Sequence, residues 1–154
     1  MPPRVKHDHA DVRALKAITS ATLFAVNEAL EEALLAEWTA LRSLWGGDDS
    51  WVGDALRPVI ESAFTTPELR ALFPLTSHNR LCFSRCSYYP FTLDSPCIAA
   101  WPDEYIVQAL WAVTDEPAPE LVHTTDLDVA ITTVVDNLPP NRAAWLGDAD
   151  HPPD

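Results

Sequence analysis

The chain has 154 residues, 47% of them hydrophobic and 21% charged, a length and balance typical of one soluble globular domain. Ten Lys and Arg residues against 23 Asp and Glu residues give a formal net charge of −13, which argues against nucleic-acid binding because phosphate backbones are repelled. No stretch is apolar enough for a membrane span, and residues 1–12 lack the apolar core of a secretory signal. We therefore expect a cytoplasmic protein with no nucleic-acid or membrane partner.

Apolar residues recur mostly three or four positions apart between Val12 and Trp45, which predicts an amphipathic helix over residues 10–45. As one rod this helix would be about 54 Å long, whereas a compact chain of this size is about 38 Å across. Either the helix breaks at Thr19 and Ser20, with Ser20 as the N-cap of a second helix, or it protrudes and pairs with a second copy of the chain.

Capping residues and prolines mark two further helices. Asp48, Asp49 or Ser50 caps a helix that runs to about residue 64, and Pro58 either kinks this helix or begins it. Thr66 with the following proline starts a short helix that stops before residue 74. Residues 10–73 are thus the predicted helical part.

After this part the sequence alternates as strands do. The predicted strands are residues 80–86, 97–101, 105–113 and a brief one at 121–123. Residues 101–104 are the expected hairpin connection.

A last helix is predicted over residues 125–138, capped by Thr125 or Asp126. The fold class is therefore α+β, with N-terminal helices followed by a small mainly antiparallel sheet over residues 80–123 and a C-terminal helix packed on it. We expect residues 1–154 to form a single domain whose ends, 1–9 and 147–154, are frayed.

Most chemically versatile side chains lie between His78 and Asp94, where we expect a pocket. If the chain is an enzyme, cofactor-free acid/base chemistry such as a cyclisation fits these residues, because an imidazole titrates near neutral pH and phenols orient polar substrates. The candidate catalytic residues are His78, Tyr88, Tyr89 and Asp94, and the candidate substrate-binding residues are Arg80, Ser84 and Arg85.

Each candidate also has a structural interpretation. The His78 ring can fix the backbone at the entry to a strand, and Arg85 can form an ion pair with Asp94 that only stabilises the fold. The two tyrosines can pack a loop between strands. Asp94 can accept backbone N–H bonds within a turn.

The three cysteines predict no metal site. Cys82 and Cys86 would lie about 13 Å apart along a strand, too far for a disulfide, and together with Cys97 they lack metal-type spacing. The sequence also has no glycine-rich phosphate loop. We expect no metal and no other cofactor.

The pattern Leu72-Phe73-Pro74, Thr76-Ser77-His78, Phe83-Ser84-Arg85 and Tyr89-Pro90 resembles a family of small actinobacterial proteins of unknown function that are labelled natural product biosynthesis proteins. The resemblance covers residues 66–140, and residues 126–140 look like the closing helix of that family. It implies an accessory or tailoring protein of secondary metabolism and carries over no catalytic residues. Cys86 stands where the family commonly has Thr, so a pocket here could take a different ligand.

The leading hypothesis is a soluble accessory or tailoring protein that acts on a small-molecule or peptide natural-product intermediate. The alternative is a noncatalytic binding or scaffold protein that presents a precursor or carrier to another enzyme. In that case the chain could be a homodimer through residues 10–45. A third hypothesis is a self-protection protein whose acidic surface sequesters a cationic product.

Overall fold

The computed structural model describes residues 9–110 and 118–154, with side chains from residue 25 onward. The elements in chain order are α1 (His9–Gly46), α2 (Trp51–Phe64), α3 (Pro67–Arg70), β1 (Phe73–Ser77), β2 (Arg80–Ser84), β3 (Cys97–Ala100), β4 (Tyr105–Gln108), β5 (Glu120–Thr124) and α4 (Leu127–Asp136). This order confirms the predicted α+β class.

The strands form one antiparallel sheet in the order β1-β2-β3-β4-β5, so each strand pairs with its neighbour in sequence. The sheet begins at Phe73, earlier than predicted, because β1 pairs along its whole length with β2. The predicted strand over residues 105–113 ends at Gln108, and its last three residues lie outside the described part. The predicted hairpin connection is present, since the backbone N–H of Trp101 donates to the carbonyl oxygen of Glu104 over 2.9 Å.

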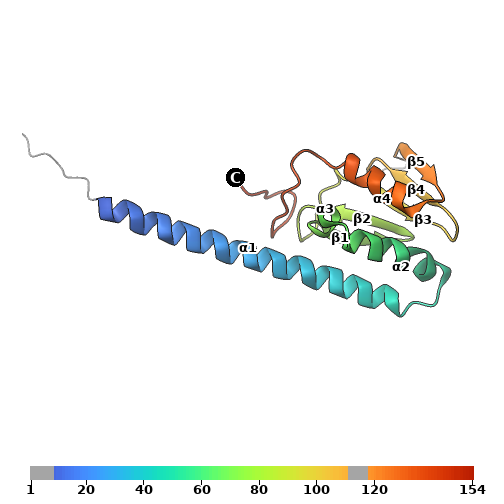
Figure 1. Ribbon diagram of the computed structural model, residues 1–154, viewed down its shortest axis with the longest axis horizontal. Coiled ribbons are helices and arrows are strands. Elements are labelled where there is room, and N and C mark those ends of the chain that lie inside the picture. Colours follow the sequence, from blue (N-terminus) through green and yellow to red (C-terminus); the bar gives the residue numbers. More distant parts are fainter. Residues whose placement is uncertain (1–8, 111–117) are drawn as a thin grey trace, which may run out of the picture.

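The prediction of a break at Thr19 and Ser20 is wrong, because α1 is continuous over 38 residues. Figure 1 shows this helix extending well beyond the sheet, with its first half away from the other elements. The helix therefore protrudes, which was the other alternative. Its length follows from the sequence, since no proline or glycine interrupts residues 9–45.

The cap predictions hold at two helices. Ser50 caps α2, its hydroxyl accepting the N–H of Gly53, and Pro58 lies inside that helix. Asp126 caps α4 by accepting the N–H groups of Asp128 and Val129. Thr66 precedes α3 as predicted but makes no side-chain cap bond. Its hydroxyl instead donates to the carbonyl oxygen of Ser62, in the last turn of α2, over 2.8 Å.

The core lies between one sheet face and the helices. Leu81, Phe83, Ile98 and Val107 from the sheet are buried in one cluster. The helices contribute the following buried residues to that cluster: Trp38, Leu41, Ala55, Leu56, Val59, Ile60, Ala63, Leu69, Ala130, Ile131 and Val134. Each fully buried Leu, Ile, Val or Phe stabilises the fold by about 1.5–3 kcal/mol, so this cluster positions every element around it.

The C-terminal segment is attached to the loop after β2. The N–H of Trp145 donates to the carbonyl oxygen of Arg85, and the N–H of Ala149 donates to that of Pro90, both over 2.8 Å. The carbonyl oxygen of Gly147 accepts the N–H of Tyr88, also over 2.8 Å. Residues 147–149, expected to fray, are therefore hydrogen bonded, whereas the other expected frayed end includes residues 1–8, which lie outside the described part.

Candidate functional site

The candidate residues between His78 and Asp94 do not share one pocket. His78 lies in the turn between β1 and β2, whereas Ser84 ends β2 and the loop containing Asp94 follows it. Ser84 lies four positions after Arg80 on the extended strand β2, a distance of about 13 Å. The structure therefore places the residues of the predicted pocket, 78–94, in two groups, one at each end of β2.

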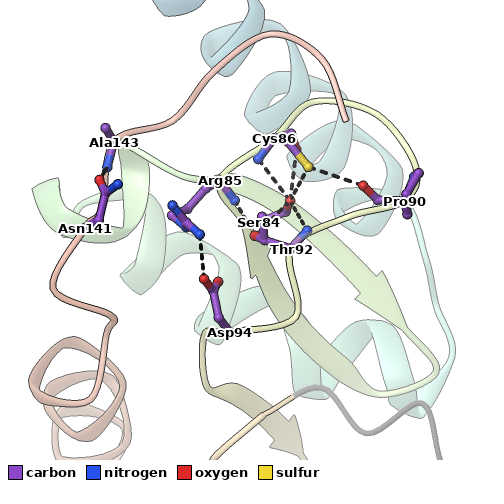
Figure 2. Close-up of polar contacts among 8 residues, drawn as sticks. All are labelled: Ser84, Arg85, Cys86, Pro90, Thr92, Asp94, Asn141 and Ala143. Carbon is purple, nitrogen blue, oxygen red and sulfur yellow. Dashed lines mark hydrogen bonds and ion pairs between the residues drawn. The ribbon is translucent and has the colours of Figure 1, made fainter. Parts of the chain in front are cut away.

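At the far end of β2, Ser84 closes a loop. Its buried Oγ accepts the N–H groups of Cys86 over 3.1 Å and Thr92 over 3.2 Å, and donates to the carbonyl oxygen of Cys86 over 2.9 Å. Figure 2 shows these bonds converging on the one hydroxyl. A serine hydroxyl has one donor and two acceptor positions. All three are used within the protein, which leaves this hydroxyl no position for a substrate.

Arg85 forms the ion pair with Asp94 that the structural interpretation predicted. Its Nη2 lies 2.7 Å from Oδ2 of Asp94, and its guanidinium lies 5.2 Å from the ring centre of Trp145. Arg85 Nε, Asp94 Oδ1 and the nearby Ser95 Oγ are buried without a hydrogen-bond partner among the described residues. The ion pair lies within the loop and explains why an arginine stands beside an apolar strand face. The contact of the guanidinium with Trp145 joins the loop to the C-terminal segment.

The two tyrosines lie on the outer surface of the same loop. Tyr88 is 67% exposed and Tyr89 is 83% exposed, and the Tyr89 ring meets Phe91 edge-on with ring centres 6.1 Å apart. Neither tyrosine lines the hollow described below. The loop therefore presents these phenols to solvent, where they do not face His78.

His78 occupies the tight turn between β1 and β2. Its φ of 55° lies in the left-handed region, which is uncommon for residues other than glycine but is several-fold enriched for His, Asn and Asp. The neighbouring Asn79 fixes the turn, since its side-chain amide donates to the carbonyl oxygen of Ala100 over 2.9 Å. Arg80, which begins β2, has a buried Nε without a partner among the described residues. The His78 side chain is exposed at the rim of a hollow.

That hollow, which we call the tryptophan groove, has a volume of about 410 Å³. It is lined by Trp45, Asp48, Ser50, Trp51, Val52, His78, Asn79 and Trp101. It lies where the end of α1, the start of α2 and the two hairpin turns of β1–β2 and β3–β4 come together. Residues distant in sequence thus build one concave surface.

Indole rings form most of its apolar wall. The rings of Trp51 and Trp101 stack with centres 5.5 Å apart and planes 9° apart, yet these residues are 48% and 41% exposed. The third ring is anchored, because Nε1 of Trp45 donates to the hydroxyl of Thr76 over 3.3 Å. Large exposed aromatic side chains beside a hollow are typical of binding surfaces.

Asp48 supplies the negative charge of the groove. The hydroxyl and backbone N–H of Ser50 both donate to its carboxylate, and these bonds hold the pKa of Asp48 below its usual range. The carboxylate is therefore ionised throughout the physiological range, and it faces solvent. A carboxylate that lines the same hollow as three indole rings is an arrangement suited to an organic cation.

Sequence reasoning missed the tryptophans and Asp48 as site residues. A signal was present, since six tryptophans in 154 residues is a high number. Trp51 directly follows the helix cap and Trp101 begins a hairpin connection, both positions that are usually exposed.

The chemistry open to the described residues also depends on their cysteines and on any metal ligands or membrane-spanning helices. Cys82, Cys86 and Cys97 are buried free thiols, which agrees with the prediction that Cys82 and Cys86 form no disulfide. No group of three or more His, Cys, Asp or Glu side chains suited to a metal occurs in the described ranges. Among those same residues, no helix has the length and apolarity needed to cross a bilayer.

Comparison with protein families matches residues 32–145 to a family of unknown function (DUF6193). This range contains the tryptophan groove and the loop closed by Ser84. No curated protein and no solved structure matches the chain. The assignment of function therefore depends on the geometry of the sites.

Proposed function

The chain belongs to the family of unknown function DUF6193, and we propose that it is an accessory protein that binds a small-molecule or peptide intermediate in the tryptophan groove. The observation that carries this proposal is the concave surface of about 410 Å³ with three indole rings and Asp48. The ligand group that fits this surface is an organic ammonium, preferably one attached to an aromatic ring. Indole faces attract such a cation by about 0.5–1 kcal/mol each at exposed sites, and the net charge of −13 favours its approach.

The biological setting of the proposal comes from the resemblance of residues 66–140 to natural product biosynthesis proteins. On that basis the intermediate belongs to bacterial secondary metabolism, in an actinobacterium, and the protein acts in the cytoplasm. Two copies pair through residues 10–45. Genes for biosynthetic enzymes beside this reading frame are expected, and a neighbourhood of unrelated housekeeping genes would count against the setting.

Ligand binding can be tested with phenethylammonium as the probe. Titration followed by NMR should shift the indole N–H signals of Trp45, Trp51 and Trp101, and should leave the Trp145 signal, at the other end of β2, unchanged. Trp101→Ala should weaken binding by roughly fivefold, the equivalent of about 1 kcal/mol, whereas Trp145→Phe should bind as the parent chain does.

The uncharged analogue 2-phenylethanol tests the role of Asp48. It should bind more weakly than phenethylammonium, and Asp48→Asn should remove the difference. Absence of any groove shift at millimolar probe, or equal shifts of all tryptophans, would rule out the tryptophan groove as the binding site.

A second candidate function, acid/base catalysis, is favoured by the position of His78 at the groove rim. In that case the imidazole transfers a proton to or from a ligand held against the indoles. Tyr88, Tyr89 and Asp94 lie outside the groove and are not needed for this chemistry. His78→Asn, which keeps a residue type tolerant of positive φ, should abolish turnover of the intermediate without weakening its binding. Full product formation by this variant would rule out catalysis by His78, and ligand binding would then be the one remaining proposed function.

A further inference from the structure

The apolar stripe of α1 continues beyond the part of the helix that packs on the core. Trp38 is fully buried, but four and eight residues earlier Leu34 and Leu30 are only partly covered, and Val26 is 54% exposed. Residues four positions apart share one helix face. The face that binds the core therefore extends, uncovered by other described elements, past the edge of the sheet (Figure 1).

A second groove adjoins this stripe between α1 and the junction of α2 with α3. Its volume is about 390 Å³, and it is lined by Glu31, Leu34, Leu35, Trp38, Phe64, Pro67, Arg70 and Ala71. Leu35 in its wall is 58% exposed. Stripe and groove together make an apolar surface that runs along α1, and the apolar face of a helix can pack on such a surface.

The charge of the sequence is distributed unevenly along α1. Residues 1–24 contain four basic and two acidic residues, whereas residues 25–154 contain six basic and 21 acidic residues. The stretch beside the stripe carries Glu28, Glu31 and Glu32, all of them exposed. The first half of the helix is thus net positive in an otherwise acidic protein, and the half beside the groove is negative.

We infer that this surface docks a second copy of the chain, with the two α1 helices antiparallel. The net-positive residues 9–19 of each copy then lie along the acidic and apolar residues 25–35 of the other, around a two-fold axis at about residue 22. A parallel pair would instead place Glu28, Glu31 and Glu32 against their own counterparts, where like charges repel. The inference rests on the proposed homodimer and adds its orientation and its contact surface.

The contact surface is tested by light scattering on the full-length chain. The parent chain should be a dimer at 50 µM, and Val26→Asp should raise the dimer dissociation constant at least tenfold. Because Val26 is exposed in the single chain, this variant should keep the circular dichroism spectrum of the parent. Ala25→Asp is the matched control. It adds the same charge at an exposed neighbouring position that lies about 100° around the helix from Val26 and away from Leu30, and it should remain dimeric.

The orientation is tested by the distance between spin labels on Ala36→Cys, an exposed position on α1. Antiparallel helices that cross near residue 22 place the two labels roughly 42 Å apart along the axis, whereas parallel helices place them roughly 10 Å apart. The native cysteines are buried, so the parent chain serves as the labelling blank.

The outcomes separate this inference from the proposed ligand binding. A monomeric parent chain overturns both the homodimer and the antiparallel contact. A dimer with the short label distance, or one that survives Val26→Asp, overturns only the antiparallel contact. Phenethylammonium binding by monomeric Val26→Asp should match that of the parent, since the tryptophan groove lies at the other end of α1.

Discussion

At the scale of single residues, the polar groups that looked most like a site are largely used for architecture. The Ser84 hydroxyl makes three hydrogen bonds within its own loop, and Arg85 is paired with Asp94. Buried polar groups need partners, because each unmade hydrogen bond costs about 1–3 kcal/mol. His78 is exposed and Asp48 is half-buried with its carboxylate held by Ser50, and because both line the tryptophan groove they are the better candidates for ligand recognition.

The thiol of Cys82 should make stability depend on alkaline pH. The β2–β3 register pairs Leu81 with Ile98, and one residue further along it brings Cys82 opposite Cys97. The neighbouring Cys97 thiol, together with burial, raises the pKa of Cys82 above its ordinary value of 9.0. As the pH rises, the thiol therefore loses its proton in the unfolded chain before it does so in the folded chain. Its contribution to the stability of the folded state is complete below pH 9.0 and decreases progressively above that pH.

The expected slope from this group is about 1.4 kcal/mol per pH unit above that point. Urea unfolding of the parent chain and of Cys82→Ala between pH 7 and pH 10.5 measures it. The difference in unfolding free energy between the two should be constant at low pH and should shrink at high pH. A difference that stays constant across the whole range would show that the Cys82 thiol titrates normally in the folded chain.

At the scale of elements, caps and turns place the candidate groove. Ser50 starts α2 immediately before Trp51, and the β3–β4 turn begins at Trp101, so two connections present the stacked indoles. The positive φ of His78 allows the β1–β2 turn to be tight enough to approach them. Local signals in the sequence thus set the backbone of each turn that carries a groove residue, although they do not bring these turns together.

The closing helix offers a direct test of a cap. Asp126→Ala removes the acceptor of two backbone N–H groups at the start of α4, and we expect a loss of about 1 kcal/mol in unfolding free energy. Asp136→Ala is the control, because an acid at the end of a helix is not stabilised by the helix dipole. It should leave stability unchanged or slightly higher. Equal losses in the two variants, measured by urea unfolding, would contradict the capping role.

At the scale of the whole molecule, Trp38 connects the protruding helix to the sheet. Its ring packs against Phe64 and Phe83, and its Nε1 donates to the carbonyl oxygens of Arg70 over 3.1 Å and Leu72 over 3.0 Å. One side chain therefore joins α1, α2, α3 and β2. Both grooves depend on this junction, because α1 forms a wall of each.

Removal of this junction should be costly. Trp38→Ala is expected to lower the unfolding free energy by about 3–5 kcal/mol, since a large buried side chain is replaced by a cavity. Leu44→Ala, on the same helix but 65% exposed and outside both grooves, should cost less than about 1 kcal/mol. Chemical denaturation at a fixed protein concentration compares the two, and similar losses would mean that α1 is not held by its buried face.

The sequence by itself determined the fold class, most helix boundaries and the Arg85–Asp94 pair, because these depend on local periodicity, capping chemistry and the need of a charge for a nearby partner. It did not reveal β1, since Phe73–Ser77 contains a proline and becomes a strand only by pairing with β2. Only the tertiary structure placed His78 and Arg85 at opposite ends of β2.

The tryptophan groove was likewise decided by tertiary structure. Its walls come from residues 45–52, 78–79 and 101, and no sequence spacing relates these segments. They meet because the strand order brings the β1–β2 and β3–β4 turns to the same end of the sheet. The core packing of Trp38 and Leu41 holds the end of α1 there. Sequence patterns report neighbours along the chain, whereas a binding surface depends on neighbours in space.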